Sequence, residues 1–416
     1  MRGILSIAWR SAWNRRFVLL LVVLSIAFST FLVMTLERVR ADVRESFSQS
    51  VSGTDLIVGP RGGRLELLLY SVFRWGSAPG TMQWSSATKI GAHRSVAWWV
   101  PLSLGDSHRG FPVLATTPSY FEHFRFGRRE RLQFEQGGGF GSDFDAVLGA
   151  DVAQALGYEP GERIVLSHGT GEADFNDHAD KPFTVVGVLR RTGTPVDRTI
   201  HIGLDGMDAV HEHFAGGVAL PASHNAAHAD DEDRTITAVL VGLKNRAAVF
   251  SVQRDIQDFR GEPLMAVLPG VVLDELWQAV GSTEQVLRWM TAFVAAVSLA
   301  GLVAVVLTGL EQRRRELAIL RAVGAGPGHV MLLLCVEGVL ITAAGAFLGL
   351  AAHWLAIGLL DDWLRVSWGV QVALTAPGAH ELTLIGSILA CGVLASLLPG
   401  LRAYRISLVD GLSPRV

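Results

Sequence analysis

Histidine and acidic side chains gather in one polar part of the sequence, between residues 168 and 233. Seven of the 13 histidines fall there, together with a run of aspartates. Imidazole and carboxylate groups are ligands that Zn, Cu and Ni accept. One interpretation is a low-affinity metal surface that holds zinc, with five candidate ligands: His168, His178, His224, His228 and Asp230. The alternative is a solvated polar loop that binds no metal.

The sequence patterns that usually indicate catalysis are missing. A phosphate-binding loop ends in a lysine that follows a glycine, but the three lysines, Lys89, Lys181 and Lys244, each follow another residue. The HExxH, GxSxG and GxGxxG patterns are absent as well. We therefore predict a chain that is not an enzyme and has no catalytic residues of its own.

One carboxylate, Glu337, interrupts a long apolar stretch near its start. An unpaired carboxylate in hydrocarbon costs at least a few kcal/mol, so this side chain should face protein. It is either an interhelical hydrogen-bonding group or a proton relay, and the lack of a second acid nearby favours the hydrogen bond. Gly345 and Gly349 follow as a GxxxG pattern, which permits close approach of another helix.

The overall composition places these residues in a membrane protein. Half of the 416 residues are hydrophobic and only 18% are charged, against about 25% charged in soluble domains. The net charge of -3 gives no indication of a nucleic-acid-binding surface. Cys335 and Cys391 both lie in apolar runs, so no disulfide framework is predicted.

Four apolar stretches are long enough to cross a bilayer, which takes about 20 helical residues. They are residues 17–36, 289–310, 330–360 and 382–401. Residues 37–288, between the first and the second, are soluble in character and long enough for their own core. The predicted fold class is therefore a membrane α-helical protein with four transmembrane helices and a large α+β extracytoplasmic domain between the first and second.

The arginines near the spans predict the orientation, because basic residues are retained on the cytoplasmic side. They are concentrated in three segments: residues 1–16, 311–329 and 402–416. Both termini are then cytoplasmic, and residues 37–288 lie outside together with the short loop at 361–381.

The outer segment alternates between strand-like and helix-like pieces. Short runs rich in branched or aromatic residues predict strands at 55–58, 97–104, 112–116, 164–166, 184–189 and 237–241. Helices are expected at 151–156, 206–214 and 246–259. Residues 61–75 are apolar enough to bind a lipid or acyl chain, although core packing explains such a stretch more often.

A specific pattern occupies the loop between the second and third spans. Residues 311–325, EQRRRELAILRAVGA, resemble the signature of the FtsX/MacB permease family. The segment SIAWRSAWNRR at 6–16 is similar to the amphipathic helix before that family's first span. The segments VLGADVAQALGYEPGERIVL at 147–166 and PFTVVGVL at 182–189 resemble its periplasmic core domain, and PGLRAYRISLVDGL at 399–412 resembles its C-terminal end.

The resemblance implies a membrane subunit in a bacterial inner membrane that works with other chains. Its partners would be a cytoplasmic ABC ATPase dimer that holds ATP and Mg, and a second copy of itself or a homologous permease. Membrane lipid and a periplasmic or outer-membrane protein are further expected partners, and nucleic acid is not. The permease itself would bind no cofactor, apart from the zinc considered above.

Within the signature, apolar and charged residues alternate at helical spacing. Leu317 and Leu320 are three residues apart, so they form a ridge that can dock in the groove of a partner. With Glu316, Arg321 and Gly324 they are the predicted ATPase-coupling element. The alternative is a juxtamembrane basic segment that only sets topology.

The predicted function is ATP-driven conformational change of the outer domain, which moves or extracts a substrate at the outer face of the membrane. Two alternatives stay open. One is a transmembrane signalling subunit, similar to FtsX, that activates an extracytoplasmic partner. The other is a membrane-anchored metal-binding or sensory protein. The size of the outer segment, 252 residues, argues against the signalling subunit, whose outer domain is usually much smaller, and the coupling pattern argues against the metal-binding or sensory protein.

Overall fold

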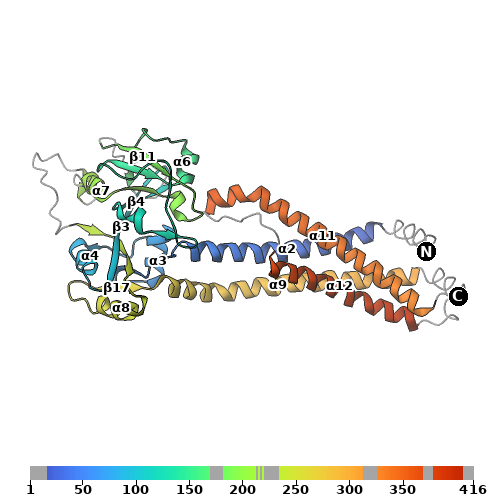
Figure 1. Cartoon of the computed structure of the whole chain (residues 1–416). Coiled ribbons are helices and arrows are strands. Elements are labelled where there is room, and N and C mark those ends of the chain that lie inside the picture. Colours follow the sequence, from blue (N-terminus) through green and yellow to red (C-terminus); the bar gives the residue numbers. More distant parts are fainter. Residues whose placement is uncertain are drawn as a thin grey trace, which may run out of the picture. The chain divides into compact units, whose positions relative to one another are not determined.

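The chain forms two compact units in a computed structural model (Figure 1). The structure describes residues 16–168, 181–211, 214–215, 218–219, 234–312, 326–368 and 378–405. One unit, the α/β domain, consists mainly of Val43–Val280. The other, the helix bundle, contains the apolar stretches on either side of it in sequence.

Four long helices supply the predicted spans. They are α2 (Arg16–Gln49), α9 (Pro269–Gln312), α11 (Pro327–Trp368) and α12 (Ala379–Arg405). Each contains a segment long and apolar enough to cross a membrane. Helices α2 and α9 are longer than the predicted spans, and each contains residues of both units. The predicted fold class is confirmed: the described residues contain four candidate transmembrane helices, with a mixed domain between the first and the second.

The bundle has an apolar interior and an apolar exterior. Val22 and Ile26 of α2 pack with Leu302 of α9 and Ile341 of α11. Many large side chains point outward instead, among them Phe293 and Phe347, which are 71% and 72% exposed. An exterior of this kind matches hydrocarbon rather than water.

One mixed sheet organises the α/β domain. In the described part of the chain it has eleven strands, and the path across it runs β17-β1-β16-β3-β4-β12-β8-β11-β7. In that order the bounds are Leu264–Val267, Leu56–Pro60, Ala238–Leu243, Val96–His108, Phe111–Thr116, Ile200–Gly203, Asp145–Leu148, Phe183–Leu189 and Phe134–Gly137. The short strands β9 (Arg163–Ile164) and β10 (Ser167–His168) pair with β11 and β3. The β4–β12 and β8–β11 pairs are parallel.

Both faces of this sheet are covered by helices. Leu56 and Val58 of β1 enter one core and Ile57 enters the other, as the two-residue period of a strand requires. The first core is covered by α4 (Trp84–Gly91), α6 (Ala150–Leu156), α7 (Leu204–His211) and α8 (Val249–Gln257). The second is covered by α3 (Arg64–Phe73) and α5 (Ser119–His123).

Each predicted strand and helix of this domain overlaps an observed one, but two of the predictions were partly wrong. The helix predicted at 206–214 is described only to His211, and Phe214 lies in strand β13 (Phe214–Ala215). Of the strand predicted at 164–166, only Ile164 is in a strand, β9.

Helix α3 was not predicted, because its run RLELLLYSVF was considered only as a lipid-binding or core segment. Leu67 and Leu68 on that helix are fully buried in the second core. The structure therefore supports core packing for residues 61–75.

Candidate functional site

Most of the predicted coupling and metal residues lie outside the described part of the chain. These are Glu316, Leu317, Leu320, Arg321 and Gly324 of the coupling element, and His178, His224, His228 and Asp230 of the metal surface. His168 ends strand β10, but its side chain is also outside the described set. Within the described residues no group of three or more His, Cys, Asp or Glu could hold a metal ion. Coupling and zinc binding therefore stay predictions.

Gly345 and Gly349 lie where α11 meets α2. A Cβ atom added at Gly345 would lie 2.7 Å from Ile26, and one at Gly349 would overlap the carbonyl oxygen of Ala27. The two helices are thus in direct backbone contact along one turn. Only a residue without a side chain fits at these positions.

A second close contact joins α11 to α12, and the sequence did not reveal it. A Cβ at Gly338 would overlap Ser396, and a Cβ at Gly392 would overlap Thr342. The two glycines are separated by 54 residues and belong to no recognisable motif.

Glu337, next to Gly338, is half-buried on α11. Both of its predicted roles stay open.

Polar pairs inside the bundle add fixed points between helices. The Ser25 and Ser298 hydroxyl oxygens are 2.9 Å apart and join α2 to α9. Thr35 Oγ1 and His353 Nδ1 are also 2.9 Å apart and join α2 to α11. His353 is 3% exposed, so its imidazole is held within the protein rather than in lipid.

At one end of the bundle, charged side chains form what we call the ion-pair network. Its members are Glu37, Arg38, Arg40, Asp42, Glu284, Arg288, His380 and Glu381. Arg40 Nε lies 2.6 Å from Glu284 Oε2, and Arg288 Nε lies 3.2 Å from Glu37 Oε1. Both contacts join α2 to α9. They are ion pairs by distance, and Arg40 Nε does not have the angle of a directed hydrogen bond.

Arg38 extends the network to α12. It lies 3.2 Å from Glu381 and 3.0 Å from Asp42, and its side chain is 12% exposed. Partly buried pairs of this kind are screened less by salt than exposed ones. The network therefore connects three of the four long helices at the bundle residues nearest in sequence to the α/β domain. The sequence shows that these charged residues lie next to the predicted spans, but it does not predict which of them form ion pairs.

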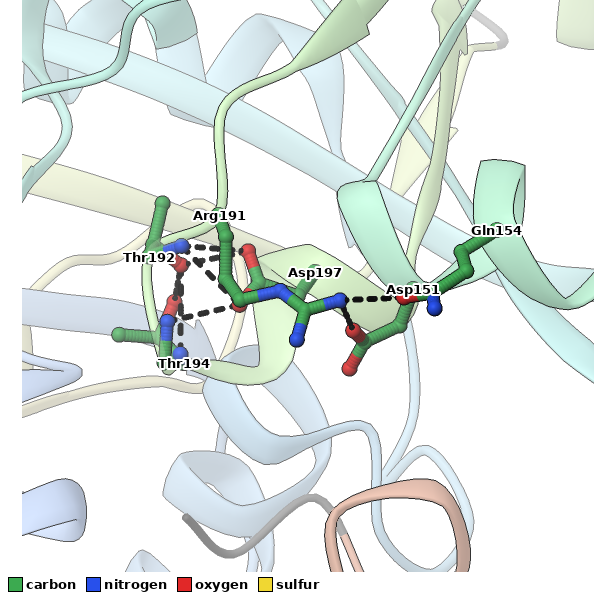
Figure 2. A network of polar contacts seen from close by, with 7 residues as sticks. Asp151, Gln154, Arg191, Thr192, Thr194 and Asp197 are labelled. Carbon is green, nitrogen blue, oxygen red and sulfur yellow. Dashed lines mark hydrogen bonds and ion pairs between the residues drawn. The ribbon is translucent and has the colours of Figure 1, made fainter. Parts of the chain in front are cut away.

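The α/β domain has a wide groove beside the edge strand β7. Its volume is about 1210 Å³, and it is lined by β7, by α6 and by the loop at residues 190–193. Figure 2 shows what holds that loop. The carboxylate of Asp197 accepts hydrogen bonds from the amides of Thr192 (2.8 Å) and Gly193 (2.7 Å) and from the Thr192 hydroxyl (2.9 Å). On the groove side, Arg191 contacts Asp151 at 2.8 Å and Gln154 at 2.7 Å.

Asp197 is 2% exposed. Burial raises its pKa to about 6, the hydrogen bonds from Thr192 and Gly193 act in the opposite direction, and nearby Asp151 adds to the rise. The loop beside the groove is thus fixed by one buried carboxyl group whose pKa is raised to about 6. The sequence analysis did not identify Asp197 as a candidate functional residue. A single aspartate in the segment TGTPVDR is what an ordinary surface turn contains, so its burial could not be predicted.

Two family models match the chain and together cover most of it. The MacB-like periplasmic core domain matches residues 17–259, and the FtsX-like permease C-terminal region matches residues 289–408. The first alone spans more than half of the 416 residues. The chain therefore belongs to the MacB/FtsX-like family and is an ABC transporter permease subunit of that type.

Curated relatives share part of their length with this chain. The macrolide export ATP-binding/permease protein MacB of Bordetella avium is 25% identical over 296 residues, which are 66% of this chain and 42% of the relative. MacB 1 of Yersinia pestis is 29% identical over 145 residues, 34% of this chain and 22% of the relative. A probable syringafactin export ATP-binding/permease protein of Pseudomonas syringae is 27% identical over 34% of this chain and 21% of the relative. The chain thus spans less than half of the length of these relatives.

Two solved structures are similar to part of the chain. The periplasmic region of MacB from Actinobacillus actinomycetemcomitans has a TM-score of 0.34 and 11% identity, over 55% of this chain and 97% of that one. The extracellular domain of the noncanonic ABC-type transporter YknZ from Gram-positive bacteria has a TM-score of 0.31 and 13% identity, over 51% and 98%. Family membership rests on the two family models.

Proposed function

We propose that this permease couples ATP hydrolysis on a separate ABC ATPase to a conformational change of its α/β domain, at the outer face of the bacterial inner membrane. ATP and Mg would be held by that ATPase dimer. The permease would act as a homodimer or with a homologous permease, in contact with lipid and with a periplasmic or outer-membrane protein. Both termini would be cytoplasmic and the α/β domain periplasmic.

The observation that carries this proposal is the way the long helices are tied together. Helices α2 and α9 each contain residues of both units, and the ion-pair network joins them to each other and to α12. Movement of one helix would therefore be transmitted to the other two. The contacts of α11 at Gly345 and Gly338 extend this coupling to the fourth helix.

The composition of the spans also supports mechanical coupling over transport through a pore. Residues 17–36 and 289–310 contain no charged side chain. A secondary transporter usually places several carboxylates near the midplane of the membrane. Substrate handling is then assigned to the α/β domain, where the groove beside β7 offers a surface of suitable size for a ligand or a partner segment.

The test is co-purification from the native membrane, followed by an ATPase assay. We expect a soluble ATPase to accompany the wild-type chain and to be lost from Arg321→Glu. Arg314→Glu is the matched control, because it makes the same charge change in the same loop outside the predicted coupling set. Equal loss in both variants would favour a juxtamembrane role that only sets topology. No ATPase with either chain would favour the membrane-anchored metal-binding or sensory protein instead.

The predicted orientation has a separate test. An alkaline phosphatase fused after Val416 should be inactive in intact cells, because that enzyme needs the oxidising periplasm to form its disulfides. The same reporter inserted at Asp258, an exposed residue of the α/β domain, should be active. The reverse pattern would show that the chain has the opposite orientation.

A further inference from the structure

The α/β domain contains two adjoining cavities in which basic side chains dominate. Their volumes are about 530 and 400 Å³, and they share Gly53, Arg129 and Arg246 in their walls. We call the combined space the basic pocket, defined by Arg44, Arg125, Arg129, Lys244 and Arg246. It lies apart from the groove beside β7, with which it shares no lining residue.

A tight hairpin supplies two of these cations. Strands β5 (Arg125–Phe126) and β6 (Glu130–Arg131) pair across a turn in which Arg129 has a φ of +67°. Gly53 presses against the base of this hairpin, where an added Cβ would lie 2.8 Å from Arg125 Cβ. Gly53 also has a φ of +104°, which favours glycine. The hairpin therefore reaches the pocket through two unusual backbone positions. Arg129 has a left-handed backbone conformation, and Gly53 could not be replaced by a residue with a side chain without strain.

The positive charges in the pocket are largely uncompensated. Arg246 pairs with Asp55 at 3.0 Å, and the same carboxylate accepts a hydrogen bond from the Leu243 amide. The other carboxylate in the walls, Asp274, accepts a hydrogen bond from Gln278. In the part of the chain that the structure describes, four of the cations form no ion pair with an acid: Arg44, Arg125, Arg129 and Lys244.

Arg125 is the one pocket cation that is partly buried, and it lies near Arg131, a further cation of the same hairpin that does not line the pocket. Partial burial lowers its pKa, and the neighbouring Arg131 lowers it further. The Arg125 guanidinium donates instead to the carbonyl oxygens of Glu122 and Phe124. Like charges held together without counter-ions are relieved by a bound anion, and guanidinium groups suit the tetrahedral oxygens of phosphate.

Two indole rings line the pocket beside the cations. Trp98 lies 5.2 Å from the His123 ring, and Gly242 underneath leaves the space that its ring occupies. Trp277 lines the second cavity, and it packs on Phe47. Half-buried tryptophans beside basic groups are typical of surfaces that meet lipid headgroups.

We propose that the basic pocket binds the phosphate group of an anionic phospholipid headgroup. The position of Arg44 favours a lipid over a soluble phosphate. It follows Leu36, the last residue of the predicted first span, by eight residues, about 12 Å of helix. Arg44 is therefore held near the membrane surface by the helix that contains the predicted first span. This inference concerns ligand binding by the α/β domain and does not depend on coupling to an ATPase.

Binding of a short-chain lipid to the purified full chain, in an uncharged maltoside detergent, tests the proposal. The probe is dihexanoyl phosphatidic acid, titrated by calorimetry, with inorganic phosphate as the second titrant. We expect saturable binding of the lipid to the wild-type chain. The double variant Arg129→Glu/Lys244→Glu should weaken it by about tenfold or more, because it replaces two cations that face the phosphate with two like-charged carboxylates.

Arg254→Glu/Arg260→Glu is the matched control, since it makes the same charge change at two exposed residues of the α/β domain that do not line the pocket. Its affinity should stay within about twofold of the wild type, because exposed charges outside the site are screened by salt. An equal loss of affinity in this control would overturn the pocket in favour of diffuse attraction. No lipid binding by the wild type would overturn it as well. If inorganic phosphate binds as tightly as the lipid, the anion site stands and the lipid assignment is wrong. Thermal midpoints close to that of the wild type confirm that both variants are folded.

Discussion

Replacing Asp197 by asparagine should change how the stability of the α/β domain depends on pH. The carboxyl group has a pKa of about 6 in the folded domain, against an ordinary value of 3.8. Because the folded value is the higher one, folding favours the protonated form. The contribution of Asp197 is therefore fully present below about pH 4 and is lost as the pH rises through 6. The difference between the two pKa values corresponds to about 3 kcal/mol.

The asparagine variant separates this charge effect from the hydrogen bonds. The amide of asparagine does not ionise near neutral pH. The variant therefore avoids the free-energy cost that the wild type has at pH 7.5, when the buried carboxyl group is ionised. It also presents an NH₂ group to one of the Thr192 or Gly193 amides, which should cost about 1–3 kcal/mol at every pH. We therefore expect the variant to be less stable than the wild type at pH 4 and close to it at pH 7.5.

Thermal unfolding of the full chain in detergent measures the difference. For a domain of this size about 1 kcal/mol shifts the midpoint by about 2–4 °C. The difference in thermal midpoint between the wild type and the variant should decrease by about 6–12 °C when the pH is raised from 4 to 7.5. Asp258→Asn is the control, because it makes the same substitution at an exposed residue of the α/β domain. A gap that stays constant over this range would refute the burial of an ionisable Asp197.

Three further predictions concern packing and ion pairing. Gly349→Val should force α11 away from α2 and lower stability by about 1–3 kcal/mol, whereas Gly386→Val, where a side chain meets open space, should leave the thermal midpoint nearly unchanged. Equal effects would contradict the close contact. A double-mutant cycle of Arg40→Ala and Glu284→Ala should give a coupling energy of about 1 kcal/mol, and strict additivity would show that the pair does not join the helices. Leu68→Ala should destabilise the α/β domain by about 2–5 kcal/mol, because its side chain is fully buried; retained stability would revive a lipid-binding role for this segment.

Local patterns in the sequence determined the broad architecture. A helix that crosses hydrocarbon must be apolar over about 20 residues, so the spans are recognisable without any partner. Strands buried on one or both faces keep their branched residues at close spacing, which located the strands of the sheet. The permease resemblance was recognisable for the same reason, because its signature is a continuous run at 311–325. Helix α3 was missed because its apolar residues predict burial but do not distinguish a core from a lipid surface.

The tertiary structure alone decided which residues meet. Gly338 and Ser396 are 58 residues apart, and their contact depends on the rotation of two helices about their axes. Arg44, Arg129 and Lys244 come from three distant segments of the chain that converge on one pocket, although nothing in the spacing of basic residues predicts it. The pKa of Asp197 depends on how deeply its turn is buried. Contacts of this kind depend on long-range packing, whereas spans, strands and motifs are local properties of the chain.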